Sequence, residues 1–172
     1  MFYQTAVTMT SLRLKALIVL IDKVQAEAQS KGMEESTLLD ARLAPDMFPF
    51  ARQIQIVTDN AKGMACRLAG REIPKYEDTE STLDELRARL QKTIDFLSTF
   101  TESDFALAST AEARFPYFPG VKMVGAGYLL TYAVPNFFFH VVTAYDILRN
   151  AGYSVGKVDF MGGQVETFPD GE

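Results

Sequence analysis

Apolar side chains recur at alternating intervals of four and three along four segments of the chain. This spacing places them on one face of a helix, as in helices that pack lengthwise in a bundle. The four segments are residues 3–28, 47–68, 82–100 and about 135–151. The pattern predicts an all-α protein in which residues 1–172 form a single domain, an up-and-down four-helix bundle.

Residues that start and stop helices agree with these limits. Pro45 and Asp46 precede the second segment and Gly70 follows it, which is the usual order of helix-starting and helix-stopping residues. Thr82 and Glu85 have the spacing of a capping box at the start of the third segment. Local chemistry and hydrophobic spacing therefore predict the same helices.

The stretch between the third and fourth helices is less regular. Residues 115–121 mix aromatic side chains with turn formers, which predicts a short extended excursion or hairpin with a Pro-Gly pair at its bend. Residues 125–134 could form one short helix before Pro135. The chain after Gly152 is rich in glycine, so we expect a loop that lies on the bundle and then frays.

The composition excludes several classes of function. The chain has 17 basic and 22 acidic side chains and a net charge of -5, whereas proteins that bind the nucleic acid backbone present a basic surface. The apolar run at residues 16–21 is too short to span a membrane, and a single cysteine suits a reducing compartment. We therefore expect a cytoplasmic protein that binds neither nucleic acid nor membranes.

One cysteine, Cys66, and one histidine, His140, limit the chemistry further. A single chain with this content has no disulfide, no zinc finger and no site of three histidines. Cys66 lies 13 residues beyond Gln53 along the second helix, so we expect it to be a small buried side chain remote from His140. The usual histidine-rich metal sites are therefore excluded within one chain, and a Cys66–His140 dyad is not expected.

The strongest polar signal joins the second and fourth helices. Asn136 and His140 are four residues apart, so both side chains leave one face of the fourth helix. Asp46, Gln53 and Asn60 are spaced by seven and form a polar stripe on the second helix. If these helices run parallel, as in a simple up-and-down bundle, the two stripes meet near the N-terminal ends of both helices.

This meeting point predicts a polar pocket between the two helices, walled by Phe50, Phe137 and Tyr145 and lined by Asp46, Gln53, Asn136 and His140. A more ordinary interpretation of His140 is a core histidine bonded to a carbonyl group or to Gln53, and the sequence leaves both open. Asp46 taken alone is an ordinary carboxylate at a helix N-terminus. The aromatic residues around Pro135 are expected to be core or interface rather than a cofactor cage.

Four runs of residues, in order along the chain, resemble a family of bacterial and fungal proteins of unknown function in the DinB/YfiT-like superfamily of metal-dependent enzymes. These runs are residues 42–47, 135–140, 143–149 and 156–160. The resemblance covers nearly the whole chain and implies a DinB-like four-helix bundle that is commonly dimeric. It also implies a site where better-known members bind a divalent metal with one histidine from the second helix and an H-x-x-x-H pair from the fourth.

Asn136 and His140 stand at the spacing of that pair, and Gln53 or Asp46 stands near the second-helix position. Amide groups are poor ligands for zinc, nickel or iron, so we expect a degenerate metal site that holds no transition metal tightly and serves as a polar small-molecule pocket. The alternative is a metal-dependent hydrolase or thiol transferase in which His140 and Asp46 hold a weakly bound divalent ion. A third possibility is a purely structural dimer.

A homodimer is also expected from apolar residues that the helix stripes leave without cover. The stretch from Phe115 to Phe118 is aromatic, and Leu12, Ile18 and Leu20 lie outside the stripe of the first helix. Such residues favour contact with a second copy of the chain.

Overall fold

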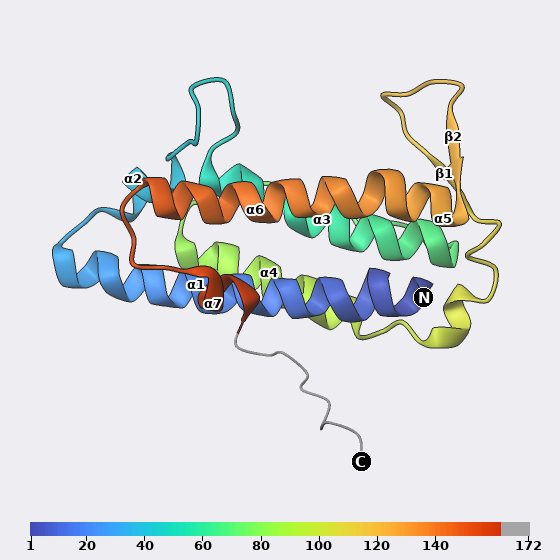
Figure 1. Ribbon diagram of the computed structural model, residues 1–172, viewed down its shortest axis with the longest axis horizontal. Coiled ribbons are helices and arrows are strands. Elements are labelled where there is room, and N and C mark those ends of the chain that lie inside the picture. The colour runs from blue at the N-terminus through green and yellow to red at the C-terminus, as the bar shows by residue number, and fades with distance from the viewer. Residues whose placement is uncertain (163–172) are drawn as a thin grey trace, which may run out of the picture.

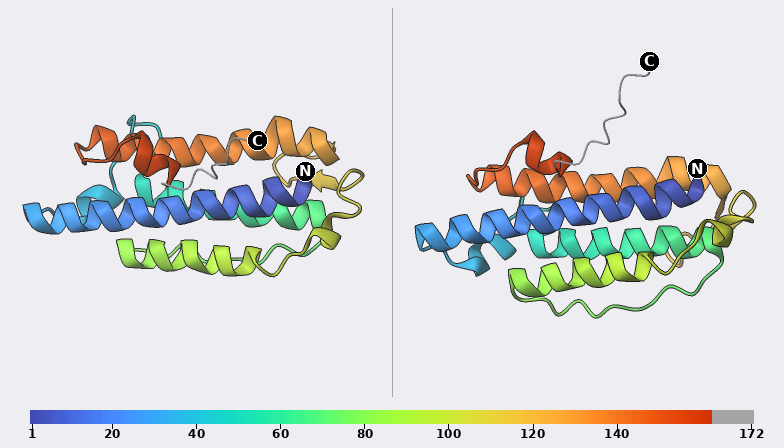
Figure 2. Two further views of the ribbon diagram at one scale, coloured as in Figure 1. Left: turned by 60° about the horizontal axis from the view of Figure 1, so that its bottom comes forward. Right: turned by 90° about the horizontal axis from the view of Figure 1, so that it is seen from below.

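Four long helices form the body of the molecule in this computed structural model, which describes residues 1–162 (Figure 1). They are α1 (Thr10–Lys31), α3 (Phe50–Ala69), α4 (Leu83–Leu97) and α6 (Val134–Asn150). All four lie side by side along the long axis of the molecule (Figure 2). The predicted all-α four-helix bundle is therefore confirmed.

Shorter elements fill the connections between these helices. A π-helical segment, η1 (Gln4–Met9), leads into α1, and α2 (Glu35–Leu39) lies between α1 and α3. After α4 come a 3₁₀ turn, η2 (Glu102–Phe105), and an antiparallel hairpin of β1 (Glu112–Arg114) and β2 (Lys122–Val124). The chain then continues through α5 (Gly125–Tyr128), η3 (Leu129–Ala133) and α6 to α7 (Lys157–Met161). The predicted hairpin is present, and its strands flank residues 115–121.

The directions of the helices differ from the simple up-and-down order. His140 of α6 hydrogen-bonds Gln53 of α3, and Asn136 of α6 hydrogen-bonds Asn60 of α3. The later residue of α6 therefore pairs with the earlier residue of α3, so the two helices are antiparallel. The expectation that they run parallel is wrong.

The cause is a long connection that we call the strap, residues 70–82. Helices α3 and α4 are parallel, because Arg89 bonds Thr58 near their middles and Arg71 bonds Thr99 just after their ends. The strap runs back along the outside of these helices in an extended conformation (Figure 2). An extended chain advances about 3.3 Å per residue and a helix about 1.5 Å, so the strap can span the 20 residues of α3.

The start of α3 also differs from the prediction. Pro49 is extended, with φ of −69° and ψ of 166°, and the helix begins only at Phe50. A residue before proline avoids the helical region, so Phe48 cannot continue a helix into Pro49. Asp46 consequently lies in the preceding loop with an exposed side chain and is not part of the polar stripe on α3.

The start of α6 is more continuous than expected. Residues 125–150 are helical throughout, without the break predicted before Pro135. The N–H of Val134 donates to the carbonyl oxygen of Leu129, five residues back, which makes the wide turn of a π-helix. A wide turn gives room for a proline ring, and Pro135 in the first turn of α6 needs no N–H donor.

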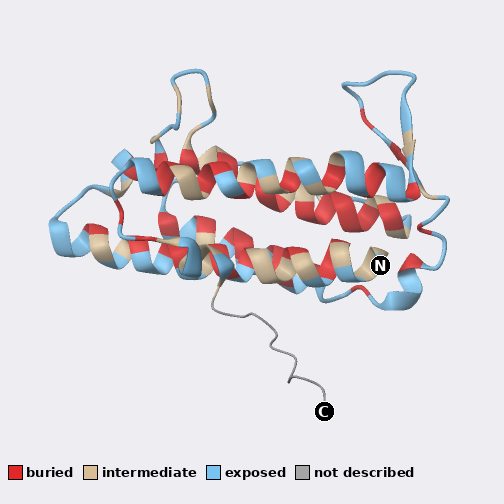
Figure 3. Cartoon of the chain, in the orientation of Figure 1, coloured by how far each residue is buried: buried red, intermediate tan, exposed pale blue. Residues whose placement is uncertain are grey.

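The core lies between the four helices, and their buried faces point toward one another (Figure 3). In α1 the buried set includes Leu20, which is 1% exposed and therefore needs no second chain to cover it. The segment Gln4–Lys31 is long and apolar enough to cross a membrane by length and composition, with a mean hydropathy of 1.3, and 44% of its apolar window is buried. A core helix of a bundle has the same properties.

The end of the described chain packs on α1. Arg13 donates to the carbonyl oxygen of Phe160 at 2.9 Å, and Lys23 forms an ion pair with Asp159 at 2.9 Å. This segment contains α7 where a loop was expected, because Asp159 accepts the N–H of Gly156 at 2.7 Å and so starts a helical turn. The predicted fraying of the tail, and the last part of the predicted domain, lie outside the described residues.

Candidate functional site

His140 and Gln53 form the centre of the polar contact between α3 and α6. The Nδ1 atom of His140 lies 2.7 Å from Oε1 of Gln53, and Gln53 is 1% exposed. The amide nitrogen of Gln53 donates to the carbonyl oxygen of Phe48 at 3.0 Å, which fixes the orientation of the amide. Nδ1 of a neutral His140 must therefore carry the proton and donate it, and Nε2 keeps a lone pair for another partner.

The charge state of His140 follows from its surroundings. Burial lowers the pKa of His140, and the positive charge of Arg52 on α3 lowers it further. The half-buried imidazole is therefore neutral at pH 7. A neutral imidazole with a free Nε2 can accept a hydrogen bond or a proton from a small molecule.

A second polar pair lies two turns along α3. Nδ2 of Asn136 donates to Oδ1 of Asn60 at 3.0 Å. Nδ2 of Asn60 is buried and, within residues 1–162, has no hydrogen-bond partner. A buried amide donor without a partner costs stability. This nitrogen is therefore a candidate contact for a hydrogen-bond acceptor on a ligand.

The other predicted pocket residues lie elsewhere. Asp46 is exposed and makes no side-chain hydrogen bond among the described residues. Phe50 and Phe137 are 1% and 0% exposed and belong to the core. Tyr145 is covered by α7, with its ring 5.4 Å from that of Phe160. The structure therefore brings together Gln53, Asn136 and His140, and it adds Asn60 to them.

Cys66 takes no part in these polar contacts. It is fully buried, and its thiol donates to the carbonyl oxygen of Glu72 at 3.3 Å. Burial raises the pKa of the Cys66 thiol to about 11. A thiol in this state is protonated at neutral pH and is a poor nucleophile.

A cavity of about 260 Å³ adjoins the Asn136–Asn60 pair between α3, the hairpin loop and the start of the last long helix. We call it the tyrosine cavity. It is lined by Arg52, Ile56, Asp59, Asn60, Arg67, Phe115, Tyr117, Tyr128, Tyr132 and Ala133. Because α3 and α6 are antiparallel, the helical residues that lead into α6 pack beside α3 here.

Arg67 is held in this cavity without an ion-pair partner. Its guanidinium carbon lies 4.5 Å from the centre of the Phe115 ring. Gly63, one turn earlier in α3, gives it room, because a Cβ atom at Gly63 would lie 2.5 Å from Nη1 of Arg67. Among the described residues, no carboxylate lies within ion-pair distance of this guanidinium.

The other charged groups at the tyrosine cavity are already paired. Asp59 forms ion pairs with Lys62 at 2.9 Å and with Arg89 at 3.2 Å. Arg52 pairs with Asp78 of the strap. Arg67 is therefore the charge at this cavity that the described part of the chain leaves uncompensated.

Three tyrosines form the wall opposite α3. The hydroxyl oxygens of Tyr117 and Tyr132 lie 2.8 Å apart, and the rings of Tyr128 and Tyr132 stack at 6.3 Å. Two hydroxyls that share one hydrogen bond leave one O–H free to donate. Burial raises the pKa of both Tyr117 and Tyr128, so their hydroxyls stay protonated and neutral at pH 7.

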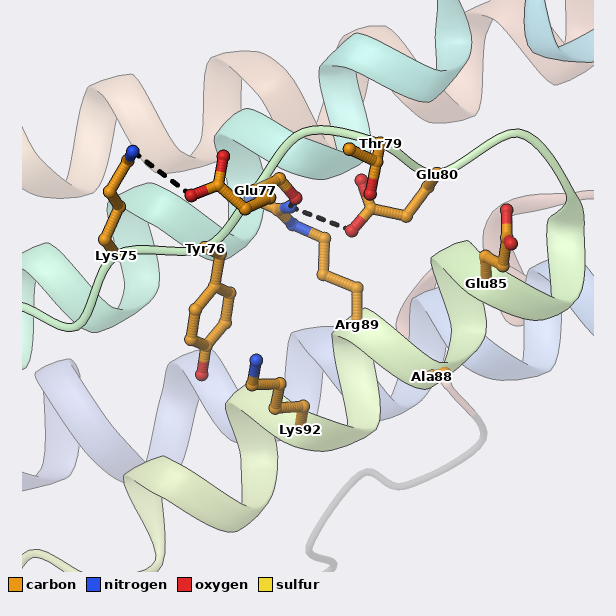
Figure 4. Close-up of a pocket in the computed structure, with 9 residues that line it drawn as sticks. All are labelled: Lys75, Tyr76, Glu77, Thr79, Glu80, Glu85, Ala88, Arg89 and Lys92. Carbon is orange, nitrogen blue, oxygen red and sulfur yellow. Dashed lines mark hydrogen bonds and ion pairs between the residues drawn. The ribbon is translucent and has the colours of Figure 1, made fainter.

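A larger hollow of about 420 Å³ lies under the strap, on α4 (Figure 4). Most of its charged side chains are engaged by other groups of the protein. Arg89, with a side chain 2% exposed, pairs with Glu80 at 2.9 Å and with Asp78 at 3.0 Å. The amino group of Lys92 lies 4.1 Å from the centre of the Tyr76 ring. These contacts hold the strap on the helices and leave few groups for a ligand.

A divalent metal does not fit the residues at the α3–α6 contact. The positions that the superfamily resemblance assigns to ligands hold two amides and one imidazole, and these side chains bond one another or Asn60. Within residues 1–162 no group of three or more His, Cys, Asp or Glu side chains could hold a metal ion. Zinc, nickel and iron require more nitrogen, sulfur or carboxylate donors than this set offers.

The sequence analysis missed Arg67 and the role of the tyrosines, which were expected to be core or interface. One signal was present, since a glycine one turn before an arginine inside a helix leaves space for the arginine side chain to fold back. Gly63 and Arg67 have this spacing. The cavity also depends on the antiparallel packing of α3 and α6, which the sequence did not predict.

The helical bundle and its polar contact between two long helices define a DinB-like protein. The chain belongs to the family described as Domain of unknown function (DUF1993), whose profile matches residues 2–161. It is similar to a solved structure, the crystal structure of a DinB family member protein from Shewanella denitrificans, with 40% identity and a TM-score of 0.92. That match covers 97% of this chain and 95% of the other. Among curated proteins, none matches the chain.

Proposed function

We propose that this protein binds a small molecule in the crevice formed by the α3–α6 polar contact and the tyrosine cavity. The observation that supports the proposal is the buried amide nitrogen of Asn60, which lacks a partner among the described residues and belongs to a residue that lines the cavity. Helix contacts in a bundle are normally apolar, and burying polar groups there without full satisfaction is costly. A binding role gives a reason for that cost.

The test is a thermal-shift screen with a matched variant. A ligand present at a hundred times its dissociation constant stabilises the folded state by about 2.7 kcal/mol. His140→Ala should lose most of the shift that a hit produces in the unchanged protein. A control substitution in the strap hollow, Lys92→Ala, should keep the shift. If a ligand raises the melting temperature of His140→Ala as much as that of the unchanged protein, the histidine is only a core residue and the proposal is contradicted.

The protein as purified is expected to carry no tightly bound transition metal. Elemental analysis after dialysis against a mild chelator should give far less than about one metal ion per chain. Close to one zinc, nickel or iron ion per chain would favour the alternative, an enzyme in which His140 and Asp46 hold a divalent ion.

The homodimer stays a prediction. Its structural support is the outer face of the helix containing α6, where Leu130, Phe139 and Val142 are 55%, 56% and 40% exposed. Light scattering at micromolar concentration should give about twice the chain mass of 19.2 kDa.

A further inference from the structure

The structure assigns a ligand class to the tyrosine cavity. We propose that it binds a small organic carboxylate, with Arg67 as the partner of the carboxylate group. This inference rests on the proposed function, because it names the kind of molecule that the crevice accepts. It follows from the charge of the cavity, from its hydrogen-bond donors and from its size.

The charge of the cavity favours an anion. Arg67 lines it and has no ion-pair partner within residues 1–162, whereas Arg52 pairs with Asp78 and Asp59 pairs with two cations. A half-buried guanidinium that lacks a counterion loses hydration without a compensating partner. A ligand carboxylate at this place would supply that partner.

The position of Arg67 is prepared for such a contact. One face of its guanidinium packs on the Phe115 ring at 4.5 Å, and the missing side chain at Gly63 leaves space for Nη1. A guanidinium stacked on a ring keeps its N–H groups free along its edge. Those edge donors match the two oxygens of a carboxylate in a bidentate pair.

Apart from Asp59, whose carboxylate pairs with Lys62 and Arg89, the remaining polar side chains at the cavity can donate hydrogen bonds. Nδ2 of Asn60 is buried without a partner, and the Tyr117–Tyr132 pair has one O–H more than its mutual hydrogen bond uses. Burial raises the pKa of Tyr117, so this hydroxyl does not become an acceptor phenolate. A guanidinium, an amide N–H and a phenol O–H together suit a ligand group that only accepts hydrogen bonds.

The size and walls of the cavity favour a carboxylate with an apolar body. A volume of about 260 Å³ is small for a binding site, and the stacked rings of Tyr128 and Tyr132 are part of its wall. One uncompensated arginine balances one negative charge, whereas a phosphate monoester carries about −1.5 to −2 at pH 7. A monoanionic aromatic or short aliphatic acid fits these limits.

The experiment compares acids with their neutral amides by calorimetry and by ligand-observed NMR. The probes are benzoate against benzamide and phenylacetate against phenylacetamide, with inorganic phosphate as a third arm. In the unchanged protein the acid should bind roughly tenfold tighter than its amide. In Arg67→Gln the acid should fall to the affinity of the amide, because the positive charge is gone.

Two further variants separate binding from folding. Arg71→Gln is the matched control, since Arg71 also packs on a phenyl ring, that of Phe100 at 4.0 Å, but does not line the tyrosine cavity. It should keep the preference for acids. Asn60→Asp keeps the shape of the side chain and replaces the unpartnered donor with a negative charge, so it should abolish acid binding. Circular dichroism should show both variants folded.

The experiment distinguishes a wrong ligand class from a wrong proposed function. If amides bind as tightly as acids, the carboxylate inference is wrong while a small-molecule site remains. If phosphate binds more tightly than every acid tested, the ligand class is wrong. If no acid binds up to about 10 mM, an affinity weaker than about 3 kcal/mol, the inference fails, and the thermal-shift screen with His140→Ala then decides the proposed function separately.

Discussion

Two arginines of this bundle, Arg89 and Arg67, differ in what surrounds them. Arg89 lies under the strap with five partners, two from α3 and three from the strap itself. Arg67 lies nearer the end of α3 and is surrounded by a phenyl ring, a glycine and a cavity. Both side chains are largely withdrawn from water, yet only one of them has its charge balanced by the described part of the chain.

The difference suggests how to distinguish a charged side chain that stabilises the fold from one that is available to a ligand. The strap hollow is the larger of the two, but its buried arginine, Arg89, is paired with carboxylates and Lys92 lies over the Tyr76 ring (Figure 4). The tyrosine cavity is smaller, and its donors exceed its acceptors. Unsatisfied groups mark a binding site better than volume does, because a ligand gains affinity from bonds that the protein leaves open.

The largest expected effect tests the strap. Arg89→Met should destabilise the protein by about 3 kcal/mol, because removing one member of a buried ionic network leaves its partners unpaired. Arg67→Met should change stability by less than about 1 kcal/mol, since it breaks no ion pair among the described residues. Urea denaturation of both variants measures the contrast. Equal losses would contradict the distinction between the two arginines.

The next effect concerns the α3–α6 contact. His140→Ala should lower the free energy of unfolding by about 1 to 3 kcal/mol, because it leaves the buried Oε1 of Gln53 without a donor. His140→Asn, which keeps an N–H donor, should lose less. A loss of the same size in both variants would show that packing matters here and the hydrogen bond does not.

The same residue predicts a dependence on pH. The folded-state pKa of His140 is lowered by burial and by Arg52, so the unfolded chain takes up a proton more readily than the folded one. The free energy of unfolding should therefore fall as pH decreases below about 6.5, the ordinary pKa of histidine. His140→Asn should lack this part of the pH dependence. Denaturation midpoints between pH 7.5 and about 5.5 provide the measurement.

The variant with the smallest expected effect on stability, Gly63→Ala, tests most directly whether the position of Arg67 matters for ligand binding. Gly63→Ala should stabilise α3 by up to about 1 kcal/mol, because glycine is a poor residue in a helix interior. The new Cβ would lie 2.5 Å from Nη1 of Arg67 and must displace it. We therefore expect a more stable protein that binds acids several-fold more weakly. A variant that is more stable and binds benzoate normally would show that the position of Arg67 is not critical.

The sequence predicted those parts of the molecule that depend on local chemistry. The capping box of α4 is present, with the N–H of Glu85 donating to Thr82 and the N–H of Thr82 donating to Glu85. The contact of His140 with Gln53 was also among the expected pairings. Hydrophobic periodicity identifies which face of a helix is buried, and two such faces limit which polar residues can meet.

The direction of each helix is not a local property, and here the prediction was wrong. Nothing in the composition of residues 70–82 says whether they form a short turn with a frayed end or a strap that crosses the bundle. The expected partner of Asn136 therefore shifted from Gln53 to Asn60. Asp46 was misplaced for a different reason, since Pro45 and Pro49 both start helices well and only Pro49 does so here.

The strap has a consequence for the order in which the chain becomes structured. None of residues 73–80 takes part in a backbone–backbone hydrogen bond in the described structure, so side chains such as Arg89 and Lys62, which donates to the carbonyl oxygen of Pro74 at 2.8 Å, hold it in place. The Arg89 anchor exists only after α3 and α4 have docked in parallel. We therefore expect the strap to close late during folding and to open first in the folded protein, and its amide hydrogens should exchange with solvent faster than those of either helix.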